Sequence, residues 1–580
     1  MGKWRKSLAL SLSFAWRAAR WDGIVVVLLL ALSAALPLLL VKLTQLLIPQ
    51  LTAGHLLTAM ALLVAQGAAS FVSSFSGFAR TAWQKVYTTK VSNYAAQTFT
   101  EHALAIGPAP MENPETYKTF IRARDTARHG RLGSLAIDLA RGLVSIIQLT
   151  ALVGILASIS VYVSALAVIL LVPSVLLQRR AGLRKFQLNQ QFARTDFGSQ
   201  YWSGLATRET IQDLHGNNLK GLLFQKWAET YRKQLAKTLS MEAMILRVSL
   251  GAAAWSSASM IVLLCGLVLW TGKGDLAGVI AGIQGVAVLF GSGAALGASL
   301  MQLEEGVRYV DEASPWLEVD GGVQLESTVE FIEFRHVAYR YPMQSKWVLQ
   351  GISAELRQGE LVAVVGSNGA GKSTLVRCLL GQLEVSDGDI VVNGTHALTT
   401  KVAWGDLAAY TPQRVVPLEV TIREYVSTGK VEAADYVPWA LTKVRAGELV
   451  DCVDEPLGVV LHEGRSLSLG QWQKLSIARL LLNRTARLVV LDEPYSSMDP
   501  GSEVDLLEIY RDLALGRIAV VVTHRENVAK VADKVIFLES GQVGGVGLHS
   551  ELLRQNAEYS SHWTSVGHRQ SLEAGGASGY

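Results

Sequence analysis

The stretch Gly366-Ser-Asn-Gly-Ala-Gly-Lys-Ser-Thr374 is a glycine-rich run that follows the apolar run Leu361 to Val365 and precedes the helix-like segment Leu375 to Leu380. A strand, a glycine-rich loop and a helix in this order form a phosphate-binding P-loop. The glycines let backbone N–H groups surround phosphate oxygens, and the helix presents its positive N-terminus to the anion. The stretch therefore predicts an α/β domain that binds a nucleoside triphosphate.

Each position of the loop has an expected contact with the nucleotide. We expect Lys372 to reach the β- and γ-phosphates and Ser373 to hold Mg²⁺. The candidate nucleotide-binding residues of the loop are Gly366, Ser367, Asn368, Gly369, Ala370, Gly371, Lys372, Ser373 and Thr374.

The composition indicates a membrane part beside this domain. The 580-residue chain is long enough for more than one domain, and a mean hydropathy of +0.28 with 18% charged residues is too apolar for a soluble NTPase. The apolar excess lies before about residue 300, which places the domain boundary near 310 to 328. The small net charge of +4, carried beside apolar segments, argues against nucleic acid as a partner.

Apolar stretches long enough to cross a bilayer predict an all-α membrane domain over residues 23–310. They lie at about 23–45, 56–78, 136–178, 248–271 and 276–299. The third is long enough for two spans if a polar turn near Ser158 to Ser160 divides it, which gives six helices. Residues 1–22, which mix aromatic and basic side chains, are expected to form a helix along the cytosolic membrane surface.

The distribution of Lys and Arg predicts the orientation in the membrane. Basic residues concentrate before residue 22 and in two long loops, 79–133 and 179–246, which places these segments in the cytosol. Both loops are compatible with helices that flank a break, at Gly107 to Pro110 in the first and near Gly204 and Gly216 in the second. We expect an integral multi-pass protein of the cell (inner or plasma) membrane, with its N-terminus and nucleotide domain in the cytosol.

Two smaller features have structural interpretations. Asp138 and Arg141, spaced i,i+3 at the cytosolic edge of the third apolar stretch, are expected to form an ion pair on one helix face. Cys265, Cys378 and Cys452 lack the paired spacing of a zinc site or a disulfide framework, and we interpret all three as small buried hydrophobic residues.

Two further strands of the nucleotide domain end in chemically useful side chains. The apolar run from Leu488 ends in Asp492 and Glu493, where the first carboxylate suits Mg²⁺ and the second suits polarisation of a water. The run Ile518 to Val522 ends at Thr523 and His524, which places an imidazole at the edge of the sheet where ligands gather.

Between them lies Leu467-Ser-Leu-Gly-Gln471, and with this stretch the chain resembles the ATP-binding cassette (ABC) transporter family. The resemblance extends over almost the whole chain, because further family motifs occur in the family's order. These are Tyr341 at the adenine-stacking position, Gln413 of the Q-loop, Ser468, Gly470 and Gln471 of the signature, Asp492 and Glu493 after the Walker B strand, Asp499 of the D-loop, and the switch histidine His524.

The resemblance implies an exporter-type half-transporter: six spans fused ahead of one cassette over residues 328–563. The loop breaks near Pro110 to Pro114 and near Leu205 to Ile211 would be coupling helices that touch the cassettes. Cassettes of this family dimerise head to tail, so Ser468 and Gly470 of one subunit would contact the nucleotide at the P-loop of another. Implied cofactors are ATP and Mg²⁺, with Ser373, Gln413 and Asp492 around the metal, Glu493 as general base and His524 as γ-phosphate sensor.

The chain departs from the family pattern at Leu469, where glycine is usual and where a side chain could alter the approach to nucleotide or point away. The segment Val460 to Gly464 also lacks a pattern common in multidrug-type exporters. Glu455 to Gly458 and Gly470 to Gln473 look instead like the branch that exports peptides, lantibiotics and antibiotics. Because Glu493 and His524 are both present, a homodimer with two competent sites is a simpler expectation than a heterodimer.

Several functions are consistent with these motifs. The leading hypothesis is ATP-driven export of a peptide-like or amphipathic product; the alternatives are another cargo such as a lipid or drug, an exporter-fold importer of a metal chelate, and an ATPase that gates a membrane partner. Membrane lipid and the cargo are the other expected partners. With about 22 residues before the first span, we expect no peptidase activity against a leader peptide, and the Gly/Ser-rich tail 568–580 is expected to be flexible.

Overall fold

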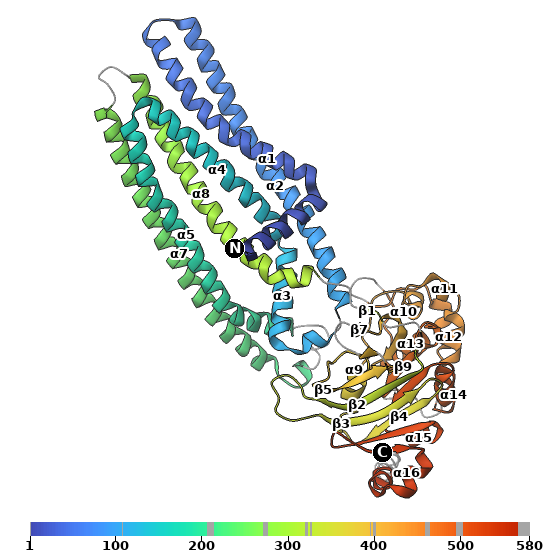
Figure 1. The fold of residues 1–580 in the computed structure, drawn as a ribbon. Helices are drawn as coiled ribbons and strands as arrows, with labels where there is room; N and C mark the ends of the chain where they lie inside the picture. Colours follow the sequence, from blue (N-terminus) through green and yellow to red (C-terminus); the bar gives the residue numbers. More distant parts are fainter. Residues whose placement is uncertain are drawn as a thin grey trace. The chain divides into compact units, whose positions relative to one another are not determined.

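The computed structural model describes residues 2–106, 108–205, 214–270, 276–318, 323–324, 328–394, 396–397, 402–458, 464–494 and 503–565. They form two compact units, coloured along the sequence in Figure 1. The first comprises Met1–Ala103 and Lys118–Val319, and the second comprises Leu104–Tyr117 and Asp320–Tyr580. The short segment Leu104–Tyr117, in the middle of the first long loop, thus groups with the nucleotide domain.

Long helices build the first unit (Figure 1). They are α1 (Gly2–Thr52), α2 (Leu56–Ala105), α3 (Pro114–Arg128), α4 (Arg131–Ile159), α5 (Val161–Gly204), α7 (Lys220–Trp270) and α8 (Leu276–Leu317). Within the described residues, α1, α2, α4, α7 and α8 make five helices long and apolar enough to cross a membrane. The apolar part of α5, Val161–Leu177, adds a shorter stretch, and the sixth span stays a prediction.

Breaks in these helices occur at defined backbone positions. Ser160, with φ −157°, separates α4 from α5 at the turn expected near Ser158 to Ser160. Ala19, with φ −156°, interrupts α1 and sets the N-terminal segment apart from the apolar remainder. Gly130, at φ +71°, separates α3 from α4, a break that the sequence pattern did not predict.

The ion pair predicted on the third apolar stretch is present. Arg141 Nη1 donates to Asp138 Oδ1 at 3.0 Å and also to Gln302 Oε1 of α8 at 3.0 Å. The expectation for one cysteine was wrong: Cys378 and Cys452 are buried in the cassette, but Cys265 is exposed on α7. An apolar side chain on the surface of a membrane-spanning helix needs no protein partner, because lipid surrounds it.

The second unit is an α/β domain with a six-stranded sheet in the order β12-β11-β4-β10-β9-β8. Its strands are β4 (Leu361–Gly366), β8 (Ala408–Thr411), β9 (Leu488–Asp492), β10 (Ile518–Val522), β11 (Lys534–Glu539) and β12 (Gln542–Gly547). All neighbours pair in parallel except β11 and β12. The P-loop strand β4 therefore lies inside the sheet, beside β10.

Two smaller sheets and short helices complete the unit. A four-stranded sheet orders β3 (Leu349–Arg357), β2 (Phe331–Tyr339), β5 (Asp387–Val392) and β6 (His396–Ala397), and β1 (Val323–Gln324) pairs with β7 (Val402–Ala403). The α-helices are α9 (Lys372–Leu379), α10 (Ile422–Ser427), α11 (Val431–Ala434), α12 (Val437–Lys443), α13 (Leu469–Leu482), α14 (Glu503–Ala514), α15 (Glu526–Val531) and α16 (His549–Gln555). The 3-10 turns are η1 (Ala109–Glu112), η2 (Gly405–Leu407) and η3 (Gly447–Cys452).

Two hydrophobic clusters hold the large sheet between them. Successive side chains of a strand point to opposite faces, and β4 sends Leu361, Ala363 and Val365 into one cluster and Val362 and Val364 into the other. Strands β9 and β10 divide their residues in the same way. A parallel sheet buried on both faces explains why these strands are continuous apolar runs, and it fixes the loops at their carboxyl ends.

Candidate functional site

The candidate nucleotide site lies at the carboxyl ends of β4, β9 and β10, where the P-loop, Asp492 with Glu493, and His524 follow neighbouring strands. Val522 of β10 pairs with both Val364 of β4 and Asp492 of β9. Residues separated by more than 150 positions in sequence therefore meet at one edge of the sheet. The site residues predicted at these three strand ends are brought together.

The backbone of the P-loop requires glycine where it is closest to its neighbours. Gly366 has φ +156°, and a Cβ there would lie 2.2 Å from the carbonyl oxygen of Leu538. Gly371, the N-cap of α9, has φ +100°, and a Cβ there would lie 2.8 Å from Leu349. The loop thus packs against β11 and β3, and α9 begins directly at the phosphate-binding residues.

Lys372 lies back over its own loop. Its Nζ donates to the carbonyl oxygens of Gly366 at 2.9 Å and Ser367 at 3.1 Å. Burial lowers the pKa of Lys372, while the nearby carboxylates of Glu493 and Asp492 act in the opposite direction. A buried ammonium held by carbonyl oxygens is well placed to exchange them for phosphate oxygens.

At the strand ends, two side chains contact the carboxylate of Glu493. Gln413 Nε2 donates to Glu493 Oε2 at 2.7 Å, and His524 Nε2 lies 2.8 Å from Glu493 Oε1. Glu493 has φ +46°, a left-handed conformation that costs a non-glycine residue about 1–3 kcal/mol. The bond from its N–H to the Val522 carbonyl oxygen, 3.1 Å, helps to hold it there.

The two carboxyl groups have opposite pKa shifts. The hydrogen bond from His524 lowers the pKa of Glu493, whereas burial raises the pKa of Asp492. Ser373 Oγ donates to Asp492 Oδ1 at 3.4 Å. Glu493 is therefore ionised at neutral pH and can accept a proton, while Asp492 is a buried carboxylate next to a hydroxyl.

These oxygen donors fit Mg²⁺. Ser373 Oγ, an Asp492 carboxylate oxygen and the amide oxygen of Gln413 are hard ligands of the kind that the ion prefers. Groups of three or more His, Cys, Asp or Glu that could hold a metal by themselves are absent from the described residues. Mg²⁺ usually combines one or two carboxylates with substrate phosphates and waters, which suits this sparse protein set.

Tyr341 lies beside the P-loop helix and next to a hollow of about 660 Å³. Its hydroxyl is 3.3 Å from Thr374 Oγ1, and Arg377 Nη1 of α9 is 3.5 Å from the same hydroxyl. The hollow is also lined by Ala109 and Glu112 of η1, and is large enough to hold a nucleoside. The predicted adenine-stacking position is thus linked by hydrogen bonds to the helix that follows the phosphate-binding loop.

The first predicted loop break contacts this region of the cassette. Glu112 of η1 accepts a charge-assisted hydrogen bond from Arg377 Nη2. Glu112 and Arg377 are each about 30% exposed, so the pair is partly shielded from water. The contact joins the middle of the loop 79–133 to the side chain that bonds Tyr341.

The signature residues begin helix α13. Ser468 is its N-cap, and its Oγ accepts from the Gln471 N–H at 3.2 Å. In turn, the Ser468 N–H donates to Gln471 Oε1 at 3.0 Å. The capping box satisfies two N–H groups at this end, and Ser468 itself is exposed, so the positive end of α13 lies at the surface of the cassette. Leu469 is 52% exposed, so its side chain points away from the cassette's own core.

Some predicted elements lie outside the described residues. They are Asp499 with the D-loop, residues 459–463 upstream of Gly464, residues 206–211 of the second loop break, and the tail 568–580.

Three side chains at this site were not predicted from the sequence. Glu112 and Arg377 belong to no recognisable motif, and only their contact identifies them. His562 lies near the same site: burial lowers its pKa, and its neighbours His524 and Lys372 act in the same direction. Its helical segment packs on β11 through Tyr559 and Phe537, whose rings are 5.3 Å apart. No local pattern in the sequence could have placed these residues.

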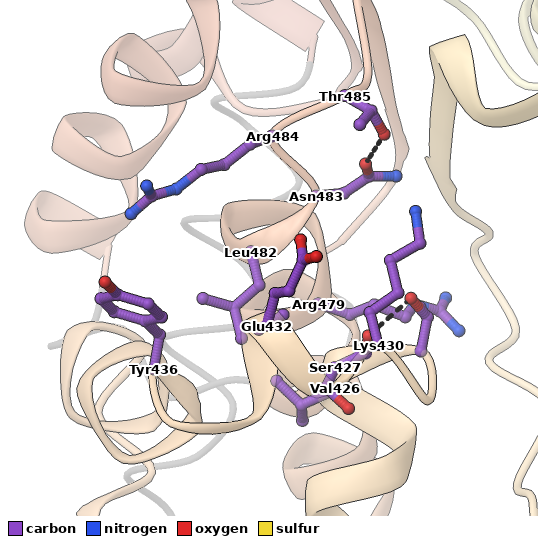
Figure 2. A pocket seen from close by; sticks show the side chains of 12 residues that line it. Val426, Ser427, Lys430, Glu432, Tyr436, Arg479, Leu482, Asn483, Arg484 and Thr485 are labelled. Carbon is purple, nitrogen blue, oxygen red and sulfur yellow. Dashed lines mark hydrogen bonds between the residues drawn. The ribbon is translucent and has the colours of Figure 1, made fainter.

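Another cavity of the cassette, of about 190 Å³, lies at the far end of α13 (Figure 2). Arg484 lies 5.1 Å from the ring of Tyr436, and Arg479 contributes a second guanidinium. Helices α10 and α13 end here, and basic side chains stabilise the negative C-terminal end of a helix. The 14 residues of α13 put this cavity about 20 Å from Ser468, away from the nucleotide site.

Comparison with known proteins finds similar chains. Residues 349–496 match the family model described as ABC transporter. The subtilin transport ATP-binding protein of Bacillus subtilis is 27% identical over 484 residues, which cover 80% of this chain and 78% of that protein. The nisin transport ATP-binding protein of Lactococcus lactis subsp. lactis is 31% identical over 39% of this chain and 38% of its own length.

Two further similarities concern the cassette and the fold. An ATP-dependent lipid A-core flippase of Alkalilimnicola ehrlichii is 34% identical over 44% of each chain. A solved bacterial Atm1-family ABC exporter with ATP bound superposes with a TM-score of 0.77 at 20% identity, covering 92% of this chain and 97% of that one. The helical unit and the cassette together thus have an exporter-type fold.

Proposed function

Because the chain is an ABC transporter with an exporter-type fold, we propose that it works as a dimer that exports a peptide-like or other amphipathic product. It is an ATP hydrolase of the cell membrane that couples hydrolysis to transport. The observation that carries the cargo class is the 484-residue similarity to the subtilin transport protein. This match is longer than the cassette, so it extends into the helical unit where cargo is bound. The flippase match spans 44% of the chain and gives no comparable support for lipid cargo.

In the proposed ATP site, the nucleotide lies between the P-loop and the signature helix of a partner subunit. Tyr341 stacks on the adenine, Lys372 and the loop amides hold the phosphates, and Ser373, Gln413 and Asp492 hold or orient Mg²⁺. The exposed N-terminus of α13, with Ser468 and Gly470, contributes positive potential to the γ-phosphate in trans. Asp499 is assigned to the same interface through the D-loop pattern.

Hydrolysis in this proposal begins with Glu493. Its ionised carboxylate accepts a proton from the attacking water, and His524 donates to the γ-phosphate and responds to its loss. The close contact between His524 Nε2 and Glu493 Oε1, 2.8 Å, holds the two side chains next to each other. Mg²⁺ supplies charge neutralisation on the phosphates when bound.

Transport in this proposal follows from a population shift. Two ATP molecules bind the closed cassette dimer better than the open one, so binding drives closure and hydrolysis resets it. The contact between Glu112 and Arg377 supports a route for this signal, because it links the first long loop to the helix that follows the P-loop.

Transport into inside-out vesicles tests the proposal. Vesicles containing the protein should accumulate a labelled lantibiotic-type peptide when ATP is added, and the same peptide should stimulate ATPase activity. Vesicles with the Glu493→Gln variant are the matched control and should accumulate none. Movement of cargo out of the vesicles would identify an importer, and stimulation by lipids but not peptides would favour a flippase; either result would overturn the proposed function.

A further inference from the structure

An apolar groove of about 390 Å³ runs along the helical unit where α1 bends. The break at Ala19 turns the N-terminal segment away from the rest of α1, and α4 closes the other wall. Its lining comes from both sides of the bend, from Tyr87 of α2 and from α4, and includes Trp16, Ile24, Val27, Ala140 and Leu143.

The residues at the floor of the groove are closely packed. Gly23 faces the ring of Tyr87, and a Cβ at position 23 would lie 3.2 Å from that ring. Ser11 Oγ donates to the carbonyl oxygen of Leu132, which anchors the N-terminal segment to the start of α4. The groove is therefore a feature of the packed helices, held on both sides of the bend.

Charge is confined to the bend of α1. Arg20 is the charged residue among those that line the groove, and its guanidinium lies 5.5 Å from the ring of Trp21. The nearby Asp22 is already paired with Lys90 at 2.8 Å. Within the described part of the chain, the exposed Arg17 and Arg20 have no ion-pair partner, so this end of the groove is positive.

We propose that this groove holds an anionic phospholipid of the cytosolic leaflet, with an acyl chain along α1 and α4 and the phosphate at Arg20. Exposed Trp4, Trp16 and Trp21 place this segment at the depth of the lipid headgroups, where amphipathic aromatic rings concentrate. An anionic headgroup is complementary to Arg17 and Arg20, and a hydrocarbon chain fits an apolar wall. This lipid would stabilise the bend at Ala19 as a bound component of the protein.

A phospholipid fits better than cargo for two reasons. The groove is open to the surroundings of the single chain, since Trp16, Ile24, Val27 and Leu143 are all exposed. Its charged end lies in the basic N-terminal segment, which the positive-inside distribution assigns to the cytosolic leaflet. Both features match a lipid already present in the membrane.

Native mass spectrometry of the full chain, released from nanodiscs of equal parts phosphatidylglycerol and phosphatidylcholine, tests the assignment. The wild-type protein should retain phosphatidylglycerol preferentially. Arg20→Gln should reduce that preference about fivefold, because one basic residue near an anionic lipid contributes about 1 kcal/mol. Ala140→Phe should displace both lipids by filling the groove. Arg5→Gln removes a charge from the same segment but outside the groove, and should retain the wild-type preference.

A second measurement uses the unaltered protein and does not depend on how the variants fold. Phosphatidylglycerol carrying a photoreactive acyl chain should label peptides that contain residues 12–28 and 136–143. Labelling spread evenly over the membrane-facing helices, or an equal preference in Arg20→Gln and wild type, would overturn the proposal. So would displacement of the lipid by a saturating peptide cargo, since the groove would then be a cargo site.

Discussion

At the scale of single residues, Glu493 combines three properties that rarely coincide. It holds a left-handed backbone conformation, it accepts bonds from Gln413 and His524, and its pKa is lowered although it is partly buried. Strain of this kind persists only where the surroundings hold it, and it concentrates at functional sites. The residue is therefore the most direct place to test the chemistry.

Glu493→Gln should abolish turnover and retain bound ATP. The amide cannot accept the proton from water, and loss of a general base costs about 10²- to 10⁴-fold in rate. ATPase assays should show that loss, while size-exclusion chromatography with ATP should show an accumulated dimer. Glu432→Gln, an exposed change in the cavity at the far end of α13, should leave both unchanged. Near-normal ATPase activity in Glu493→Gln would refute the assignment.

His524→Ala should move the pH dependence of the residual ATPase activity. The hydrogen bond from His524 is the largest cause of the lowered pKa of Glu493, and burial acts in the opposite direction. Without the imidazole, burial remains and the pKa of Glu493 rises. The acid limb of the kcat/KM profile should therefore shift to higher pH relative to wild type. His55→Ala, in the exposed turn between α1 and α2, should leave the profile in place; an unshifted limb in His524→Ala would contradict the geometry.

At the scale of elements, the turn η1 and the helix α9 are joined by one partly shielded ion pair. Glu112 comes from the break in the first long loop, and Arg377 lies one turn after the P-loop residues Lys372 to Thr374. Arg377 also lies within 3.5 Å of the Tyr341 hydroxyl. A displacement of η1 would therefore move Arg377 and, through it, the Tyr341 side chain on which the adenine is proposed to stack.

A double-mutant cycle at this pair measures the coupling. Glu112→Arg and Arg377→Glu should each lower peptide-stimulated ATPase activity by bringing like charges together, and the double exchange should recover a large part of it. We expect a coupling energy of about 1 kcal/mol, because the pair is only partly buried. Glu333 and Arg335 form a more exposed pair on β2, and the same exchange there should show little coupling. Strictly additive losses of activity at Glu112 and Arg377 would show that the pair does not couple the first long loop to the cassette.

At the scale of the whole molecule, one cassette contains only half of the proposed ATP site. The P-loop lies at one edge of the sheet, and the exposed N-terminus of α13 with Ser468 is available to another subunit. In a head-to-tail dimer each site combines the P-loop of one subunit with the signature of its partner. In this proposal a complete ATP site therefore forms only when two subunits associate.

Mixing two inactive variants should reveal this arrangement. Lys372→Ala disables a P-loop and Ser468→Arg disables a signature, so a dimer of the two has one site with both defects and one intact site. Random assembly of a symmetric dimer should give about a quarter intact sites, detectable as recovered ATP trapping. Mixing Lys372→Ala with Ser373→Ala gives no intact P-loop and should recover nothing. No recovery in the first mixture would exclude a site shared between subunits of this chain.

The strands and loops of the cassette could be predicted because their signals are local. The apolar runs Leu361 to Val365, Leu488 to Leu491 and Ile518 to Val522 became β4, β9 and β10, and the glycine-rich loop followed the first of them. The turn near Ser160 and the pair between Asp138 and Arg141 were also local patterns. The break at Gly130 and the exposure of Cys265 were not predicted, because a helix continues or faces lipid according to its neighbours.

The sequence by itself determined that this protein has a membrane domain and an ATP-binding cassette, because hydrophobic length, charge distribution and motif order are properties of a linear chain. Only the tertiary structure decided which distant side chains meet: Glu493 with His524 and Gln413, Glu112 with Arg377, and the bend of α1 with α4. The physical reason is that such contacts depend on strand order and helix packing, which join residues with no sequence relation. The P-loop was evident from its spacing, and its surroundings were evident only once the chain was folded.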